Sequence, residues 1–367
     1  MNRKVKLGII GVGQIGKIHL ERYAKIPDME MVAACDIDAP ELRRVSELHK
    51  IPHSYEKFRD LLERDDIEAV DVCLHNNLHA PVTIAALEAG KHVYCEKPMA
   101  GAYADAKTML EAARRCGRNL SIQLGLLFTP ESKMAKRLID EGHLGKLYHA
   151  RSCGYRRRGR PYVDGYGSEN FVKMEVAGGG ALFDMGVYHI SQLLHLLGQP
   201  AVERVSGKLY QETDMDPGRR SSSGYNVEEL GLGLVRFAGG LTMDVIESWA
   251  VHLNEFEGSS IAGSKGGVRL NPFSFHTTLG DAPLDAKFDL EEAETRWHAL
   301  RETETAYDSS QHHWVAALQG RVPLWPTAEI ALQTMQISEG IRLSHQLDRE
   351  VTAQEIDALS KSTALKL

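Results

Sequence analysis

The sequence predicts an α/β fold in its first third and an α+β fold in the remainder. Short apolar runs alternate with helical segments up to about residue 125, and β-type runs follow one another directly beyond it. Strands separated by single helices form parallel, doubly wound sheets, whereas strands without intervening helices pair in antiparallel fashion. At roughly 100–200 residues per domain, a chain of 367 residues accommodates both parts.

The apolar runs of the first part are short and lack polar alternation, which is typical of strands covered on both faces. We expect strands at residues 5–10, 30–35, 69–74, 92–95 and 120–124. The stretches between them have helical character, and Pro27, Gly90 and Gly117 stand where three of these helices end. The expected helices comprise residues 14–26, 40–50, 79–89 and 103–116. Residues 1–125 are therefore predicted to form a doubly wound parallel sheet that binds a cofactor.

One further helix is expected at residues 133–141, after which β-type runs predominate. These runs comprise residues 147–154, 202–210, 229–237, 241–249 and 259–263. Helices are expected at 187–197, 310–319 and 328–346, and residues 214–225 are rich in turn formers, which predicts an exposed, mobile loop. Residues 126–367 are therefore predicted to form a substrate-binding α+β domain, whose last helices could pack back on the first.

The composition is that of an ordinary globular protein, with 43% hydrophobic and 25% charged residues. The formal charge of -7 gives no support for a nucleic-acid or anionic-membrane partner. No apolar run reaches the roughly 18 residues that a membrane helix needs. The five cysteines form no CxxC pair, which predicts buried free thiols in a reducing cytoplasm. We expect no disulfide scaffold and no metal site.

A GxGxxG motif occupies residues 11–16, between the first expected strand and the first expected helix. That context makes it a candidate dinucleotide-binding loop. Gly11 permits the tight turn, Gly13 lets the backbone approach a pyrophosphate, and Gly16 lets the helix pack closely on the strand. Free N–H groups at the positive end of the helix dipole would bind the pyrophosphate. The predicted cofactor residues of this loop are Gly11, Gly13, Gln14, Ile15 and Gly16.

Asp36 lies about 20 residues beyond Gly16, at the end of the second expected strand. A carboxylate there can accept hydrogen bonds from the adenosine ribose hydroxyls, and it would repel a 2′-phosphate. The residues that follow, 37–40, supply no positive charge for such a phosphate. The sequence therefore predicts NAD as the cofactor, with NADP as the less favoured alternative.

Three further motifs make a family resemblance specific. Residues 74–79 read LHNNLH, residues 96–98 read EKP, and residues 178–186 read GGGALFDMG. In this order, together with the GxGxxG loop, they resemble the Gfo/Idh/MocA family of NAD(P)-dependent oxidoreductases, which includes glucose–fructose oxidoreductase and inositol dehydrogenases. The resemblance covers nearly the whole chain. It implies an N-terminal Rossmann domain and a C-terminal domain with a large, open, mostly antiparallel sheet, through which members commonly form homodimers or homotetramers.

The resemblance also implies roles for individual residues. Lys97 matches the active-site lysine of the EKP motif, and Glu96 matches the acid beside the nicotinamide ribose. Asn76 and His79 match the loop that lies along the cofactor, and Asp184 matches the aspartate that opens the active-site helix. The implied reaction is hydride transfer between the nicotinamide and a carbohydrate-like alcohol or its ketone.

The chain departs from the commonest family pattern four residues after Asp184, where Tyr188 replaces a histidine and His189 follows. Residues i and i+4 share a helix face, whereas residue i+5 is rotated by roughly 140°. A phenol, with a pKa of about 10, is a poor base at neutral pH, but a nearby ammonium stabilises the phenolate. Lys97 and Tyr188 are therefore a workable acid/base pair. His189 is the alternative proton carrier, because the ordinary pKa of histidine is better placed.

Four arginines stand within residues 156–160. The run is either a solvated loop at the end of a strand or an electropositive rim for a sugar acid or a phosphorylated sugar. The resemblance places this segment beside the substrate pocket. On the second interpretation Arg156 and Arg158 bind the substrate, and Tyr155 and Tyr162, which flank the run, stack on a sugar ring.

These observations predict an enzyme that transfers a hydride between NAD and the secondary alcohol or ketone of a sugar, inositol or sugar derivative. Two alternatives stay open. A related mechanism keeps NAD tightly bound and recycles it during epimerisation or glycoside cleavage. A non-catalytic NAD-binding regulator is less favoured, because Lys97 and Asp184 are both present. The expected partners are a carbohydrate-like small molecule and further copies of the chain. If the arginine run binds the substrate, that substrate is expected to be anionic.

Overall fold

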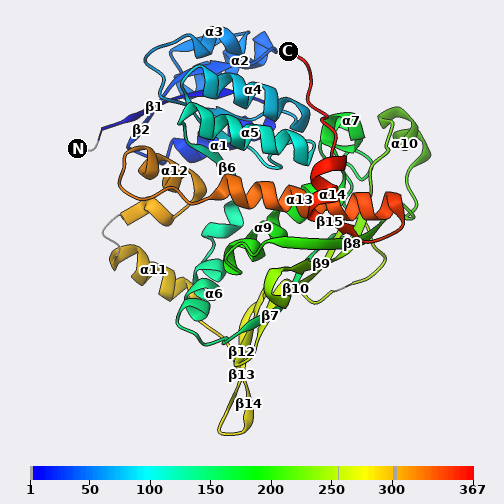
Figure 1. The fold of residues 1–367 in the computed structure, drawn as a ribbon. Helices are drawn as coiled ribbons and strands as arrows, with labels where there is room; N and C mark the ends of the chain where they lie inside the picture. The colour runs from blue at the N-terminus through cyan, green and yellow to red at the C-terminus, as the bar shows by residue number, and fades with distance from the viewer. Residues whose placement is uncertain (1–2, 255, 301–303) are drawn as a thin grey trace.

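The structure, a computed structural model, describes residues 3–254, 256–300 and 304–367. It contains two sheets, and helix α13 (Thr327–Leu347) runs between them (Figure 1). The first sheet is parallel throughout and has the strand order β3-β2-β1-β4-β5-β6. This is the order of the dinucleotide-binding doubly wound fold, so the predicted parallel sheet is confirmed.

Five of the six strands of the first sheet, all except β3, lie within one residue or two of the predicted runs. They are β1 (Val5–Ile10), β2 (Met29–Cys35), β3 (His53–Tyr55), β4 (Ala69–Val72), β5 (His92–Cys95) and β6 (Leu120–Ile122). The helices that connect them are α1 (Gln14–Tyr23), α2 (Ala39–His49), α3 (Phe58–Leu62), α4 (Asn76–Glu88) and α5 (Tyr103–Cys116). The sequence pattern does not reveal β3 or α3, because elements this short show no clear periodicity.

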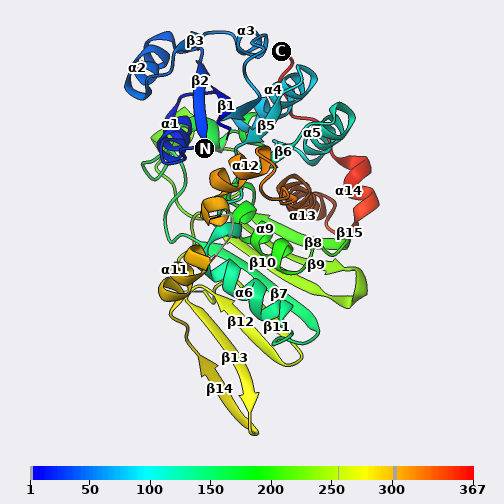
Figure 2. The same cartoon turned by 90° about the vertical axis from the view of Figure 1, so that its left-hand side faces the viewer.

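The second sheet has the order β14-β13-β12-β11-β7-β10-β9-β8-β15 and is antiparallel except between β7 and β10. Its strands are β7 (Leu147–Tyr155), β8 (Val202–Tyr210), β9 (Leu230–Phe237), β10 (Thr242–Ser248), β11 (Ser260–Gly263), β12 (Gly266–Leu270), β13 (Phe273–Leu279), β14 (Ala282–Ala286) and β15 (Val351–Thr352). The prediction of a large, mostly antiparallel sheet is confirmed. Strands β13 and β14 form a hairpin that extends away from the body (Figures 1 and 2).

Helices cover the face of the second sheet that is turned toward the first sheet (Figure 2). They are α6 (Pro130–Asp140), α9 (Gly186–Leu196) and α13. Leu193 of α9 and Ile337 of α13 are fully buried in one cluster with Val205 of β8 and Val245 of β10. The apolar faces of these helices therefore form a continuous core between the two sheets.

The C-terminal elements α12 (Ser310–Leu318) and α14 (Ala353–Leu359) also pack against the first sheet and its helices. The hydroxyl of Tyr94 on β5 donates to Ser310 Oγ at 2.7 Å. The backbone N–H of Thr363 donates to Asp105 Oδ2 on α5 at 2.8 Å. Both ends of the chain therefore contribute to the packing around the parallel sheet.

The remaining elements are short. They are α7 (Met174–Ala177), α8 (Ala181–Asp184), α10 (Pro217–Ser223), α11 (Leu290–Leu300) and the 3-10 turns at Gly125–Phe128, Glu169–Val172, Ala238–Gly240 and Glu304–Tyr307. Residues 214–225 were expected to lack regular structure, but Asp216 accepts from the N–H of Arg219 at 2.7 Å and caps α10. Across the described ranges, no helix has the length and apolar character required to cross a membrane.

Candidate active site

The loop between β1 and α1 has the backbone geometry that a phosphate-binding loop requires. Gly11 has a φ of 95°, and a Cβ there would lie 2.2 Å from the carbonyl oxygen of Cys73. A Cβ at Gly16 would lie 2.1 Å from the carbonyl oxygen of Gly11, so glycine is needed for α1 to approach this turn. A Cβ at Gly13 would meet nothing within 4 Å, which leaves room for a ligand against the backbone.

The N-terminus of α1 fits the phosphates of a dinucleotide. No side chain of the described residues caps it, and its first turn contains no acid. The N–H groups of Gln14 and Ile15 therefore lie at a helix end that favours an anion. Asp36 follows β2 and accepts from the N–H of Val12 at 2.8 Å and of Asp38 at 3.0 Å. Those two contacts fix the Asp36 carboxylate beside the loop, as binding of an adenosine ribose would require.

The predicted catalytic residues meet where α8 and α9 face the end of β5. Lys97 Nζ lies 2.9 Å from Asp184 Oδ1 and 4.4 Å from the centroid of the Tyr188 ring. The indole N–H of Trp249, which follows β10, donates to Asp184 Oδ2 at 3.1 Å. Lys97 comes from the segment after the parallel sheet's β5, whereas the other three residues belong to the second part of the chain. The site is therefore assembled at the junction of the two sheets.

Electrostatics keep both partners of this ion pair charged. Burial would lower the pKa of Lys97, but Asp184 first, together with Tyr188 and Glu96, outweighs burial and raises the pKa of the ammonium above its ordinary value. Burial would raise the pKa of Asp184, but Lys97 and the Trp249 indole hold it below its usual range. Lys97 is thus an ammonium at neutral pH, suited to stabilise negative charge nearby and not to accept a proton.

His189 packs against the second sheet. Its Nδ1 lies 3.0 Å from Glu247 Oε2 on β10, and a Cβ at Gly154 on β7 would lie 2.2 Å from His189 Cε1. Glu247 is fully buried and also accepts from the hydroxyl of Ser152 at 2.8 Å. Burial would lower the pKa of His189, but the Glu247 carboxylate outweighs burial and raises it. His189 therefore has a fixed ring and its own carboxylate partner, while Tyr188 contacts Lys97.

The residues matched to the cofactor loop are held by backbone groups of the protein. His79 is fully buried, and its Nδ1 lies 2.8 Å from the carbonyl oxygen of Pro98. Asn76 Nδ2 donates to the carbonyl of Ala177 at 2.7 Å, and Glu96 accepts from the next backbone N–H at 2.8 Å. These contacts fix the loops at residues 74–79 and 96–98, and direct contact with a cofactor stays a prediction.

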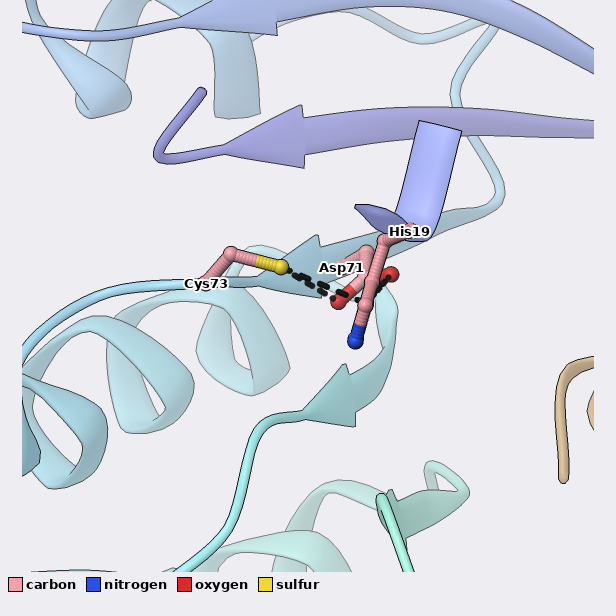
Figure 3. Close-up of side chains that lie close together, drawn as sticks. All are labelled: His19, Asp71 and Cys73. Carbon is pink, nitrogen blue, oxygen red and sulfur yellow. Dashed lines mark hydrogen bonds and ion pairs between the residues drawn. The ribbon is translucent and has the colours of Figure 1, made fainter. Parts of the chain in front are cut away.

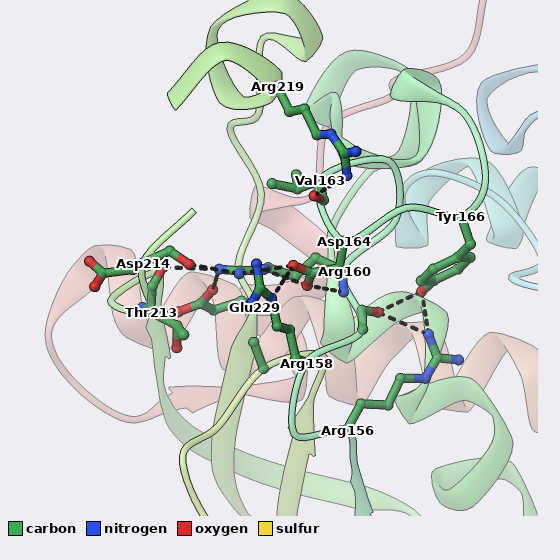
Figure 4. A network of polar contacts seen from close by, with 12 residues as sticks. Arg156, Arg158, Arg160, Val163, Asp164, Tyr166, Thr213, Asp214, Arg219 and Glu229 are labelled. Carbon is green, nitrogen blue, oxygen red and sulfur yellow. Dashed lines mark hydrogen bonds and ion pairs between the residues drawn. The ribbon is translucent and has the colours of Figure 1, made fainter. Parts of the chain in front are cut away.

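The arginine run is divided between buried and exposed positions, and its polar contacts are drawn in Figure 4. Arg160 is fully buried and bonds to Asp164 Oδ2 through Nε and to Glu229 Oε2 through Nη1, each at 2.9 Å. The Arg158 side chain is 71% exposed and pairs with the same Asp164 at 3.0 Å. The two acids pair with two of the four arginines, Arg158 and Arg160, so half of the run's positive charge is balanced within the protein. A positive rim for the substrate is therefore narrowed to the other two arginines and stays a prediction. Contact of Arg158 with a substrate stays a prediction.

Arg156 is the member of the run that lies near the catalytic residues. Its Nη1 donates to the carbonyl of Gly159 at 3.1 Å and to the hydroxyl of Tyr166, and its guanidinium lies 5.3 Å from the Tyr166 ring centroid (Figure 4). It also helps to lower the pKa of Asp184, after Lys97 and Trp249. No acid within the described ranges forms an ion pair with Arg156. It is thus a cation available to a ligand.

The two tyrosines that flank the run have partners within the protein. The hydroxyl of Tyr155 donates to the carbonyl of Asn254 at 2.7 Å, and its ring meets Phe256 edge-on with centroids 5.2 Å apart. The hydroxyl of Tyr162 lies 3.2 Å from Ser222 Oγ. Stacking of Tyr155 or Tyr162 on a sugar ring stays a prediction.

Trp249, Tyr166 and Glu247 are site residues that the sequence pattern did not identify. Trp249 orients Asp184, Tyr166 holds Arg156, and Glu247 holds His189. One feature of the sequence could have identified Trp249, namely its position at the end of the predicted run 241–249. Ends of strands at a domain junction commonly carry ligand-binding side chains.

Two family models match the chain. The first, described as "Oxidoreductase family, NAD-binding Rossmann fold", matches residues 5–124. The second, the "GFO/IDH/MocA C-terminal domain", matches residues 132–269. Both agree with the fold, and the first spans the phosphate loop.

Named relatives agree with these matches. D-glucoside 3-dehydrogenase of Escherichia coli strain K12 is 30% identical over 281 residues, which are 74% of this chain and 79% of that protein. Inositol 2-dehydrogenase of Salmonella typhimurium strain LT2 is 35% identical over 153 residues, which are 40% of this chain and 45% of that protein. A solved structure of levoglucosan dehydrogenase in complex with NADH has a TM-score of 0.80 at 21% identity, covering 96% of this chain and 99% of that one. The chain belongs to the Gfo/Idh/MocA family of oxidoreductases.

Proposed function

We propose that the protein oxidises a secondary alcohol of a sugar, inositol or sugar derivative with NAD, or catalyses the reverse reduction. The observation that carries this proposal is the contact of Lys97 with both Asp184 and Tyr188 at the junction of the two sheets. The substrate class is supported by the relatives, which are named for glucosides, inositol and levoglucosan. NAD, when bound, supplies the hydride acceptor.

The residues of the site transfer the proton of the substrate and stabilise the charge that results. Tyr188 takes the hydroxyl proton of the substrate, and the Lys97 ammonium stabilises the phenolate. Asp184 holds the ammonium in place and is itself held by the Trp249 indole. His189 is the second candidate for the proton, because its Nδ1 contact with Glu247 leaves Nε2 for a substrate.

The cofactor preference follows from the phosphate loop and Asp36. Gly11, Gly13 and Gly16 leave room for the pyrophosphate, and Asp36 receives the ribose hydroxyls and repels a 2′-phosphate. NAD is therefore preferred over NADP. We also infer a cytoplasmic homodimer or homotetramer assembled through the second sheet. The face of that sheet turned away from α9 and α13 carries no helix of the described residues (Figure 2).

A cofactor-reduction screen tests the proposed activity. NAD and NADP are each offered with a panel of polyols, aldoses, glycosides and sugar acids, and NADH absorbance is followed. Reduction of NAD by at least one class is expected. Substrate conversion without net NADH, by a protein that purifies with NAD bound, would instead support recycling of the cofactor. Neither reduction nor conversion on any of the panel would contradict the proposal.

Lys97→Ala tests the assignment of the site. The change removes the cation that stabilises the phenolate, so kcat is expected to fall by about 10²–10³-fold, as for loss of a preorganised electrostatic group. Binding of NADH, measured by fluorescence titration, is expected to stay largely intact, because the phosphate loop and Asp36 are untouched. Turnover close to that of the wild type would refute this assignment.

A further inference from the structure

A buried histidine lies between the phosphate loop and the EKP motif. His19 is on α1, three residues after Gly16, and is fully buried. Its Nδ1 lies 2.8 Å from Asp71 Oδ2, and its Nε2 lies 2.8 Å from Glu96 Oε1. Figure 3 shows the ring beside Asp71 of β4, with Cys73 on the following residues. No step of the proposed chemistry uses His19.

The contacts of this ring require its charged form. Both ring nitrogens face carboxylate oxygens, and a neutral imidazole has only one N–H to donate. Burial would lower the pKa of His19, but its interactions with Asp71 and, second, with Cys73 together outweigh burial and raise the pKa well above the ordinary value. Burial would raise the pKa of Glu96, but the hydrogen bond from His19 holds it below its usual range. Two buried acids without this cation between them would be costly.

The other titratable groups around the ring are neutral. Cys73 Sγ lies 3.3 Å from His19 Nδ1, and the Tyr94 ring centroid lies 5.9 Å from that of His19. Burial raises the pKa of the Cys73 thiol and of the Tyr94 and Tyr23 hydroxyls, so none of them is ionised at neutral pH. The ligand atoms of His19, Asp71 and Cys73 lie within 4.8 Å of one another, but an uncharged thiol is a poor metal ligand.

Glu96 connects His19 to the catalytic lysine. Its second oxygen, Oε2, accepts from the backbone N–H of Lys97 at 2.8 Å. On the far side of the same turn, His79 Nδ1 lies 2.8 Å from the carbonyl oxygen of Pro98. The backbone of the EKP motif is therefore held at both ends by buried histidines, by His79 directly and by His19 through Glu96.

We propose that His19 is a positioning residue, which bridges Asp71 and Glu96 and so holds the Lys97 backbone where its ammonium meets Asp184 and Tyr188. Because α1 begins at the phosphate loop, the same bridge ties the cofactor site to the catalytic lysine. The kinetic part of this inference rests on the proposed dehydrogenase activity, whereas the charge and geometry of the bridge do not.

The variant His19→Gln removes the cation and keeps a side chain of similar size. At saturating NAD and substrate, kcat is expected to fall about 10–100-fold, the effect of displacing a catalytic group by a fraction of an ångström to about one ångström. The Kd of NADH, from fluorescence titration, is expected to change much less. Without the imidazolium, buried Glu96 loses its low pKa. The kcat of the variant should therefore fall with decreasing pH over a range in which wild-type kcat is level.

His313→Gln is the matched control. His313 is equally buried, and its Nε2 accepts from the N–H of Trp325 at 2.9 Å, but it has no contact with the EKP turn. This variant is expected to lose stability and to keep its kcat and its pH profile. Two results would overturn the inference: a loss in His19→Gln confined to NADH affinity, or an equal loss of kcat in both variants.

If His19→Gln fails to fold or the wild type shows no turnover, the protonation state of the His19 ring tests the inference by NMR spectroscopy. In wild-type protein labelled with 15N-histidine, both ring nitrogens of His19 are expected to carry protons at about pH 8.5, where an ordinary histidine is neutral. A singly protonated His19 ring, or a stoichiometric metal ion bound to it, would overturn the inference. Absence of turnover combined with a doubly protonated ring would refute the proposed function alone.

Discussion

The two segments that meet at the junction of the sheets hold their cations in different ways. On one side, Lys97 stands on a turn whose backbone is fixed by buried groups, and its ammonium bonds to Asp184. On the other side, the run at residues 156–160 lies on a loop after β7. There Arg160 is buried against acids, while Arg156 has no acid partner within the described ranges.

This difference shows that packing, not the number of charges in a stretch of sequence, decides which cation is available to a ligand. Four arginines in five positions suggest a strongly positive surface. One of Arg160's partners, Asp164, lies four residues away, but the other, Glu229, lies 69 residues away and arrives with another strand. A single lysine whose backbone is fixed by buried neighbours is therefore better placed for catalysis than Arg158 and Arg160, the arginines that pair with acids.

Tyr188→Phe is expected to have the largest effect. It keeps a ring beside the Lys97 ammonium and removes the hydroxyl, so kcat should fall about 10²–10⁴-fold, the contribution of a general acid–base group. Steady-state kinetics give kcat, and NADH titration should show unchanged cofactor affinity. His189→Gln is the paired variant and should cost less, because His189 is bonded to Glu247. A larger loss in His189→Gln than in Tyr188→Phe would move the proton transfer to His189.

Arg160→Met tests the arginine run, the second of the two segments compared above. The change leaves buried Glu229 without its cation and Asp164 with the exposed Arg158 alone. Removing one partner of a buried pair costs about 3–5 kcal/mol of unfolding free energy. Arg158→Met is the control, because its side chain is 71% exposed and an exposed pair contributes about 0–1 kcal/mol. Urea denaturation measures both. If the two variants lost the same free energy of unfolding, burial would not explain a difference between Arg160 and Arg158.

Features of the active site that depend on local order could be predicted from the sequence. The spacing of Gly11, Gly13 and Gly16, the EKP lysine and Asp184, which stands between α8 and α9, each lie within one short motif. Their partners could not be predicted in the same way. His19 meets acids that are 52 and 77 residues away, one on β4 and one directly after the neighbouring strand β5. Such contacts depend on strand order and side-chain direction, which no single stretch of sequence contains.

Prediction of the strands from the sequence was likewise limited by how long each strand is and how exposed its residues are. The buried runs of the parallel sheet were predicted because both of their faces are covered. Strand β14 has mostly exposed residues and contains Pro283, so no apolar pattern marks it. The hairpin that it forms with β13 became evident only in three dimensions (Figure 2).

Arg156→Met is expected to have the smallest effect and bears on substrate class. A guanidinium without an acid partner can bind a carboxylate or phosphate of the substrate, and a charge-assisted hydrogen bond contributes about 1.5–3 kcal/mol. Because Arg156 is only half-buried, we expect the lower end of that range, a rise in KM of about tenfold for sugar acids or sugar phosphates. The kcat should change little, since Lys97 and Tyr188 keep their contacts.

The control for this variant is Arg157→Met, which removes an exposed charge from the same loop and should leave KM unchanged. Neutral polyols and glycosides provide a second control, because they have no anionic group for Arg156 to bind. Added salt should reduce the advantage of the wild type for anionic substrates, since screening weakens a partly exposed charge. An equal rise in KM for neutral and anionic substrates would mean that Arg156 shapes the pocket through Tyr166 and Gly159 and does not recognise charge.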